Sequence, residues 1–201
     1  MKYLELTIGA ILVYNFVLAR FLGICPFLGV SKRLGTAMGM SGAVVFVMTI
    51  ASFITSLIYR YLLKFEIDGT PYDLSFLQVL LFILVIAGLV QLIEIMLQKL
   101  SPKLYQALGI YLPLITTNCG VLGVTMNVIA DGMNYGEALL TALGCGLGFF
   151  LAMVLFSGVR SRVAEAEPPK SFEGLPITLV SAAIVSLSFF GLTGIIDRLF
   201  G

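Results

Sequence analysis

Six long runs without a single Asp, Glu, Lys or Arg limit the possible folds of this chain more than any other feature. The runs cover residues 6–19, 34–59, 74–93, 104–130, 138–159 and 174–196. A helix needs about 20 apolar residues to cross a bilayer. The first run is short by itself, but it continues past Arg20 to Ser31. The pattern therefore predicts an all-α polytopic membrane protein with six transmembrane segments, in which residues 3–24 are a retained segment and not a cleaved signal peptide.

Composition supports this class and excludes several others. Charged residues make up 11% of the chain and hydrophobic residues 59%, whereas soluble domains carry roughly 25% charged residues. We therefore expect residues 1–201 to form a single integral membrane domain in contact with lipid. The net charge of +1, without a long basic run, gives no support for nucleic-acid binding. The absence of histidine from the sequence excludes most catalytic triads, zinc sites and haem ligation.

Lysine and arginine in the short loops predict the orientation of the segments. The loops after the first, third and fifth segments carry the larger number, namely Lys32, Arg33, Lys99, Lys103, Arg160, Arg162 and Lys170. The opposite side carries Lys2, Arg60, Lys64 and Arg198. We therefore expect the odd-numbered loops in the cytoplasm and both termini outside.

A short cysteine motif occurs once in each half of the chain. Cys25 begins C-x-x-L-G-V at residues 25–30, and Cys119 begins the same pattern at residues 119–124, an offset of 94 positions. Each copy falls at the end of the first segment of its half, and each half holds an odd number of segments. Two related halves must then lie in opposite orientations. The sequence predicts two inverted three-helix repeats, at about residues 1–98 and 99–201, and such repeats commonly form a functional site near the bilayer midplane.

Helix-disrupting residues stand beside both cysteines. Pro26 follows Cys25, and Gly120 follows Cys119. Proline and glycine weaken a helix, and irregular backbone at membrane depth is tolerated only where protein or a cavity surrounds it. We therefore expect the first helix of each half to be broken, with two half-helix ends that meet inside the bilayer and each present a thiol. Polar residues precede the second cysteine: Thr116, Thr117 and Asn118.

Packing alone is the ordinary explanation of a buried cysteine or of closely spaced glycines. We assign it to Cys145, because Ala51 occupies the position 94 residues earlier. We assign it also to the pairs Gly35/Gly39 and Gly144/Gly148. Cys25 and Cys119 differ, because the repeat preserves both of them. Thiolates select iron–sulfur clusters, copper(I) or zinc, and an iron–sulfur cluster typically takes four cysteines, so one chain supplies half a site and a partner or a second copy supplies the rest.

Two stretches carry a family resemblance. "YNFVLARFLGICPFLGVSKRL" (residues 14–34) and "LPLITTNCGVLGV" (residues 112–124) resemble the A-type subunits of the bacterial Rnf complex. They are similar, less closely, to the E-type subunits of the sodium-pumping NADH:quinone oxidoreductase. The resemblance extends over the whole chain in length and in its six-helix pattern.

This resemblance implies a complex of the bacterial inner membrane that passes electrons between ferredoxin and NAD and couples them to Na⁺ or H⁺ translocation. It also implies a paralogous E-type subunit of opposite orientation, with a [2Fe-2S] cluster shared at the interface. The two ligands from this chain are then Cys25 and Cys119, and the environment of the cluster includes Arg20, Thr117 and Asn118. The sequence contains no nucleotide or flavin motif, so we expect NAD and flavin on other subunits.

Two charged residues inside apolar segments have two interpretations each. Glu94 shares a helical face with Gln91 and Gln98; it either lines an ion path, as intramembrane carboxylates often do, or is an interfacial group paired with Lys99 or Lys103. Arg20 either offsets the charge of a cluster or extends to the cytoplasmic surface.

Two other functions fit the same pattern. A secondary transporter also uses inverted repeats with broken helices, and its polar groups here would be Asn15, Thr116, Thr117 and Asn118. A purely structural protein that holds redox partners together is the third alternative.

Overall fold

The chain is all-helical throughout the part described by its computed structural model. This part comprises Thr7, Gly9, Ile11 and residues 15–31, 34–63, 75–100, 105–106, 112–166 and 169–200. The main elements, in chain order, are α2 (Phe16–Arg20), α3 (Ile24–Val30), α4 (Leu34–Ile58), η2 (Tyr59–Leu63), α5 (Ser75–Leu100), α7 (Leu112–Thr116), α8 (Cys119–Ala130), α9 (Tyr135–Glu165) and α10 (Leu175–Phe200).

Among the described residues, four helical stretches are long and apolar enough to cross a membrane. They are Leu34–Tyr61, Leu77–Met96, Pro113–Ala130 and Tyr135–Glu165, and Leu175–Gly191 in α10 is a shorter apolar stretch. Each corresponds to one of the predicted runs. The predicted first segment lies partly outside the described residues. The chain is thus a multi-pass membrane protein, as the charge-free runs predicted, while the count of six segments stays a prediction.

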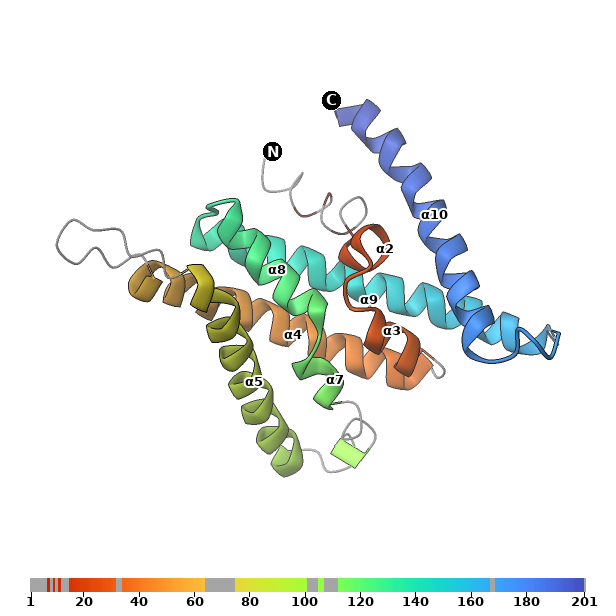
Figure 1. The fold of residues 1–201 in the computed structure, drawn as a ribbon, viewed down its shortest axis with the longest axis horizontal. Helices are drawn as coiled ribbons and strands as arrows, with labels where there is room; N and C mark the ends of the chain where they lie inside the picture. The colour runs from red at the N-terminus through yellow and green to blue at the C-terminus, as the bar shows by residue number, and fades with distance from the viewer. Residues whose placement is uncertain are drawn as a thin grey trace.

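Helices α4 and α9 lie side by side at the centre of the molecule and pack over most of their length (Figure 1). Their close approach depends on Gly146, where an added β-carbon would lie 3.1 Å from the Cα of Val45. Gly144 and Gly148 are buried in the same helix, as predicted. Gly35 is exposed and an added β-carbon there would meet nothing within 4 Å, so the predicted packing role of Gly35 is wrong within this chain.

The two outer helices extend away from the central pair on opposite sides (Figure 1). Helix α5 contacts α4 and the short helix α7, and α10 contacts α9 and the short helix α2. Each outer helix thus touches the central helix of its own half and the broken helix of the other half. The two halves of the chain repeat the same set of helix contacts.

Two arginines show which ends of the helices lie on the same side. Arg160 near the end of α9 donates to the carbonyl of Leu28 and, at 2.8 Å, to the hydroxyl of Ser31 at the end of α3. Arg60 donates at 3.1 Å to the carbonyl of Met133 in the turn between α8 and α9. The ends of α3 and α9 therefore share one side and the end of α4 shares the other with the α8–α9 turn, which agrees with the predicted alternation of loops.

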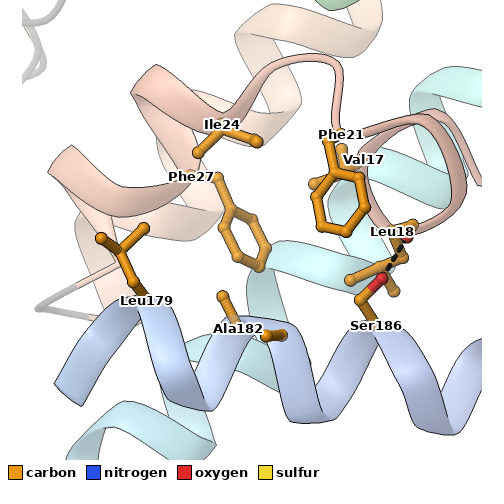
Figure 2. A pocket seen from close by; sticks show the side chains of 9 residues that line it. Val17, Leu18, Phe21, Ile24, Phe27, Leu179, Ala182 and Ser186 are labelled. Carbon is orange, nitrogen blue, oxygen red and sulfur yellow. Dashed lines mark hydrogen bonds between the residues drawn. The ribbon is translucent and has the colours of Figure 1, made fainter. Parts of the chain in front are cut away.

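The first helix is broken between Arg20 and Ile24. Phe21 and Gly23 both have left-handed backbone, with φ of 55° and 86°. The Leu22 N–H donates at 3.0 Å to the carbonyl of Phe16, so the carbonyl of Leu18 loses the partner that a continuous helix provides. The hydroxyl of Ser186 on α10 donates to this carbonyl instead (Figure 2).

The second break has the same position in its half. Helix α7 ends at Thr116, and α8 begins at Cys119 after Thr117 and Asn118. Broken first helices are thus confirmed, but both breaks precede the cysteines, whereas Pro26 and Gly120 follow them. Pro26 lies in the first turn of α3, where a missing N–H costs nothing because that group has no intrahelical partner.

We predict that Ser186→Ala destabilises the protein by about 1–3 kcal/mol, because it leaves the Leu18 carbonyl buried without a donor. The measurement is thermal unfolding of the purified, detergent-solubilised complex. Ser188→Ala is the matched control, since the Ser188 hydroxyl is exposed and bonds only within α10, to the carbonyl of Ile184 at 3.0 Å. Equal effects of the two substitutions would contradict the importance of the bond to Leu18.

Candidate functional site

Both repeat cysteines lie in the first turn of a half-helix and are exposed. Cys25 is the second residue of α3, and Cys119 is the first residue of α8. Their neighbours Pro26, Asn118 and Gly120 are buried. The two thiols are therefore presented at the surface of the chain from otherwise buried segments.

A hydrogen bond joins the two helix breaks. The main-chain N–H of Gly23 donates to the Sγ of Cys119 at a distance of 2.9 Å between nitrogen and sulfur. Gly23 lies two residues before Cys25, so this bond brings the second cysteine beside the break that precedes the first. The two half-helix ends therefore meet and each carries an exposed thiol, as expected, while their position inside the bilayer stays a prediction.

Asn118 fills the space between the two breaks. Its Oδ1 accepts the N–H of Gly120 at 2.9 Å and thereby caps α8. A β-carbon added at either Gly23 or Gly120 would lie 3.1 Å from this oxygen. The Nδ2 of Asn118 is buried and has no hydrogen-bond partner in the structure. Asn118 is thus close to Cys119, as predicted, but its amide is enclosed by the chain and not presented at the surface.

The hydrogen bonds of Thr117 and Arg20 go to groups other than the two thiols. The Thr117 hydroxyl donates to the carbonyl of Pro113 at 3.0 Å. The Arg20 guanidinium donates at 3.2 Å to the Oδ1 of Asn127, about two helical turns beyond Cys119 along α8.

Asn127 is close to the end of α8 that leads into the α8–α9 turn, on the opposite side from the end of α3. The contact with Asn127, together with stacking over the Phe16 ring at 5.2 Å, places the Arg20 side chain toward the α8–α9 turn. Both interpretations of Arg20, beside a cluster or at the cytoplasmic surface, stay predictions.

Glu94 is half-buried on α5, and its Oε1 accepts a hydrogen bond from the Tyr105 hydroxyl at 3.3 Å. Gln91 and Gln98 are exposed. Lys103, one of the two partners expected for an interfacial carboxylate, lies outside the described residues. The observed partner is therefore a phenol, and the role of Glu94 in an ion path stays a prediction.

Within the described part of the chain, no group of three or more His, Cys, Asp or Glu side chains is placed to hold a metal ion. Cys145 is 2% exposed and packs in the core, as predicted. Cys25 and Cys119 are thus the two thiols that remain accessible to a ligand from outside.

Comparison with known proteins gives a family. The model of the Rnf-Nqr subunit, described as a membrane protein, matches residues 3–196. The chain belongs to the Rnf-Nqr family. A relative from Acetobacterium woodii is described as the A-type subunit of a Na(+)-translocating ferredoxin:NAD(+) oxidoreductase complex. It is 51% identical and covers 96% of this chain and 98% of its own length.

Two further relatives are both described as the A-type subunit of an ion-translocating oxidoreductase complex. The one from Syntrophotalea carbinolica is 51% identical over 96% of this chain and 97% of its own length. The one from Shewanella piezotolerans is 48% identical over 97% of this chain and 98% of its own length.

The sequence of this Rnf-Nqr chain did not predict the structural roles of two residues, Asn15 and Gly23. Asn15 caps α2 through its Oδ1, which accepts the Val17 N–H at 3.2 Å, and its Nδ2 donates to the carbonyl of Gly148 at 2.8 Å. An asparagine before a short helix is a capping signal, but its partner on α9 is not visible in the sequence. Nothing in the sequence indicated that the main-chain N–H of Gly23 would donate to the Sγ of Cys119.

A small apolar pocket of about 80 Å³ lies between α10 and the broken helix of residues 16–30 (Figure 2). Phe21, Ile24 and Phe27 line one side and Leu179 and Ala182 the other. The polar group of this pocket is the Ser186 hydroxyl, which already donates a hydrogen bond to the carbonyl of Leu18. The pocket therefore lacks the polar groups that a transported solute would require, which weighs against the transporter alternative at this place.

We predict that a membrane-permeant maleimide labels Cys25 and Cys119 in the detergent-solubilised chain produced without partner subunits, and leaves Cys145 unlabelled. The reason is exposure, because the first two thiols are accessible and the third is enclosed in α9. Mass spectrometry of the labelled peptides measures the extent at each site. Labelling of Cys145 at the same rate as the other two would contradict this arrangement.

Proposed function

We propose that this chain is a membrane component of an ion-translocating electron-transport complex and holds half of an intramembrane [2Fe-2S] cluster. The other half comes from a paralogous membrane protein of opposite topology in the same complex. One observation carries the proposal: two helix breaks, at equivalent positions of the two halves, are joined by the bond from the Gly23 N–H to Cys119, so Cys119 lies beside the break that precedes Cys25, and both thiols are exposed.

The donor set fits an iron–sulfur cluster that is shared between chains. Thiolate sulfur is the ligand that such clusters require, and typically four are needed. Cys25 and Cys119 supply two, and the described residues place no third acidic, cysteine or histidine ligand beside them. The exposed position of the two thiols supports a partner that approaches from outside with the remaining pair.

The repeated helix contacts support the inverted arrangement. Helices α5 and α10 each contact the broken helix of the opposite half, and both breaks immediately precede a cysteine segment. We infer two inverted three-helix repeats and six membrane segments, with both termini outside the bacterial inner membrane. A paralogue of opposite topology would present its own two thiols at the same depth.

When bound, the cluster would supply one-electron transfer between a reduced carrier on one side of the membrane and an oxidised carrier on the other. Cys25 and Cys119 would hold its iron from this chain. The start of α8 directs the positive end of its dipole toward the anionic sulfur. The flavin and NAD belong to other subunits, and the Acetobacterium woodii relative is named for the ferredoxin:NAD(+) reaction.

In this proposal, the negative charge that an electron adds to the cluster couples electron transfer to the movement of a cation. One added electron in a medium of low dielectric constant attracts a cation much more strongly than it would in water. Glu94, half-buried on α5 and bonded to Tyr105, is the carboxylate in the described part that we assign to this cation path. The names of the relatives specify Na⁺ for one of them and an unspecified ion for the others.

Replacement of either cysteine by serine should abolish the iron–sulfur EPR signal of the purified complex, because a hydroxyl is a poor substitute for thiolate at such iron. Iron content and the EPR spectrum of the reduced complex are the measurements. Cys145→Ser is the matched control and should retain both. An iron-free wild-type complex, or a signal that survives Cys25→Ser and Cys119→Ser, would contradict the cluster; transport of a solute by the chain alone would then favour the secondary transporter.

Glu94→Gln should abolish ion transport by the complex in proteoliposomes and leave electron transfer between carriers intact, because it removes the charge that would bind the cation. Glu165→Gln is the control, since Glu165 is exposed and faces Arg162 at 3.8 Å at the end of α9. Unchanged transport in the Glu94 variant would remove this residue from the ion path.

A further inference from the structure

The N–H of Gly23 is available to Cys119 because the helix break releases it. Gly23 is the residue that precedes α3, and its left-handed backbone, with φ of 86°, separates it from α2. The first N–H groups of a helix have no acceptor within that helix. The Sγ of Cys119, at 2.9 Å, accepts this one. A main-chain N–H of the first half of the chain thus donates a hydrogen bond to a thiol of the second half.

In the second half of the chain, the equivalent main-chain N–H has a different kind of acceptor. The offset of 94 positions places Thr117 at the position of Gly23. The Thr117 N–H donates to the carbonyl of Pro113 at 3.1 Å, and the Thr117 hydroxyl bonds the same carbonyl. The donor that symmetry would offer to Cys25 is therefore occupied, and the two cysteines of this chain are chemically unequal.

A side chain at Gly23 would meet close neighbours and would also be strained by the left-handed backbone. A β-carbon at Gly23 would lie 3.1 Å from the Oδ1 of Asn118 and 3.2 Å from the ring of Phe149. Asn118 is itself fixed, because it caps α8 through the Gly120 N–H at 2.9 Å. Asn118 therefore caps α8, which carries Cys119, and its Oδ1 lies on the side of Gly23 where a β-carbon would be.

We propose that Gly23 is a positioning residue whose main-chain N–H raises the reduction potential of the cluster through Cys119. This inference rests on the proposed function, because it requires a cluster at these thiolates. Hydrogen bonds to the sulfur ligands stabilise negative charge and are one of the factors that set cluster potentials. The reduced cluster carries one more electron and no additional proton, so it gains more from the donor than the oxidised cluster does.

The test is a redox titration of the purified complex, with dithionite as reductant and the cluster EPR signal as readout. Gly23→Ala, which disfavours the left-handed backbone and displaces the donor, should keep the iron content and shift the midpoint potential to a more negative value. An exchangeable proton coupled to the reduced cluster, seen by ENDOR in H₂O and lost in D₂O, should weaken in the same variant. Gly29→Ala is the matched control in α3, because its β-carbon would meet only Leu114 at an ordinary 3.9 Å.

A second variant keeps the inference testable if Gly23→Ala does not assemble. Asn118→Ser retains an N-cap oxygen for α8 but leaves space beside Gly23 where the buried amide was, which loosens the position of the Gly23 N–H, so we again expect a more negative potential and a weaker proton coupling. Thr117→Ser is its control. An unchanged potential and coupling in every variant that assembles would overturn this inference while leaving the cluster in place, whereas a signal independent of Cys25 and Cys119 would overturn the proposed function itself.

Discussion

Two helix breaks leave main-chain donors and acceptors without partners inside their own helices, and the packing of the molecule satisfies those groups. Unpaired backbone groups in an apolar medium cost several kcal/mol each, so irregular segments need partners from the protein. At the first break, the Ser186 hydroxyl donates a hydrogen bond to the Leu18 carbonyl, and the Sγ of Cys119 accepts one from the Gly23 N–H. At the second, Asn118 accepts the Gly120 N–H. The breaks are therefore built into the fold and are not local defects.

The partners at the first break come from the other half of the chain, and this connects satisfaction of the backbone to formation of the site. Cys119 and Ser186 belong to the second half and both bond residues of the first. Asn15 extends the same principle, because its amide joins α2 to the Gly148 carbonyl on the central helix α9. The contacts that stabilise the breaks are thus the contacts that bring the two cysteine segments together.

The two cysteine segments lie at the surface of a membrane protein of the Rnf-Nqr family. Their two thiols are exposed, while the third cysteine is buried in α9. In the proposed function, a second chain completes the site with its own thiols. The Gly23 N–H donates to Cys119, whereas the equivalent Thr117 N–H donates to the carbonyl of Pro113, so the two cysteines differ in their hydrogen bonding.

The sequence by itself determined the class of the protein and the helical segments beyond the first, and its repeated motif predicted that the segments of Cys25 and Cys119 meet. Those properties depend on local composition and on a repeated motif, because charge-free runs of sufficient length are stable in a bilayer only as helices or closed barrels. Helix-disrupting residues also indicated the breaks, but their position was shifted, since proline is tolerated in the first turn that follows a break.

Only the tertiary structure decided the direction of Arg20, the partner of Glu94, and the hydrogen bond between Gly23 and Cys119. Each depends on residues that are distant in the sequence and meet only when the helices pack. A glycine carries no side-chain signal for such a role, because what it contributes is backbone conformation and a main-chain donor whose acceptor is chosen by the fold.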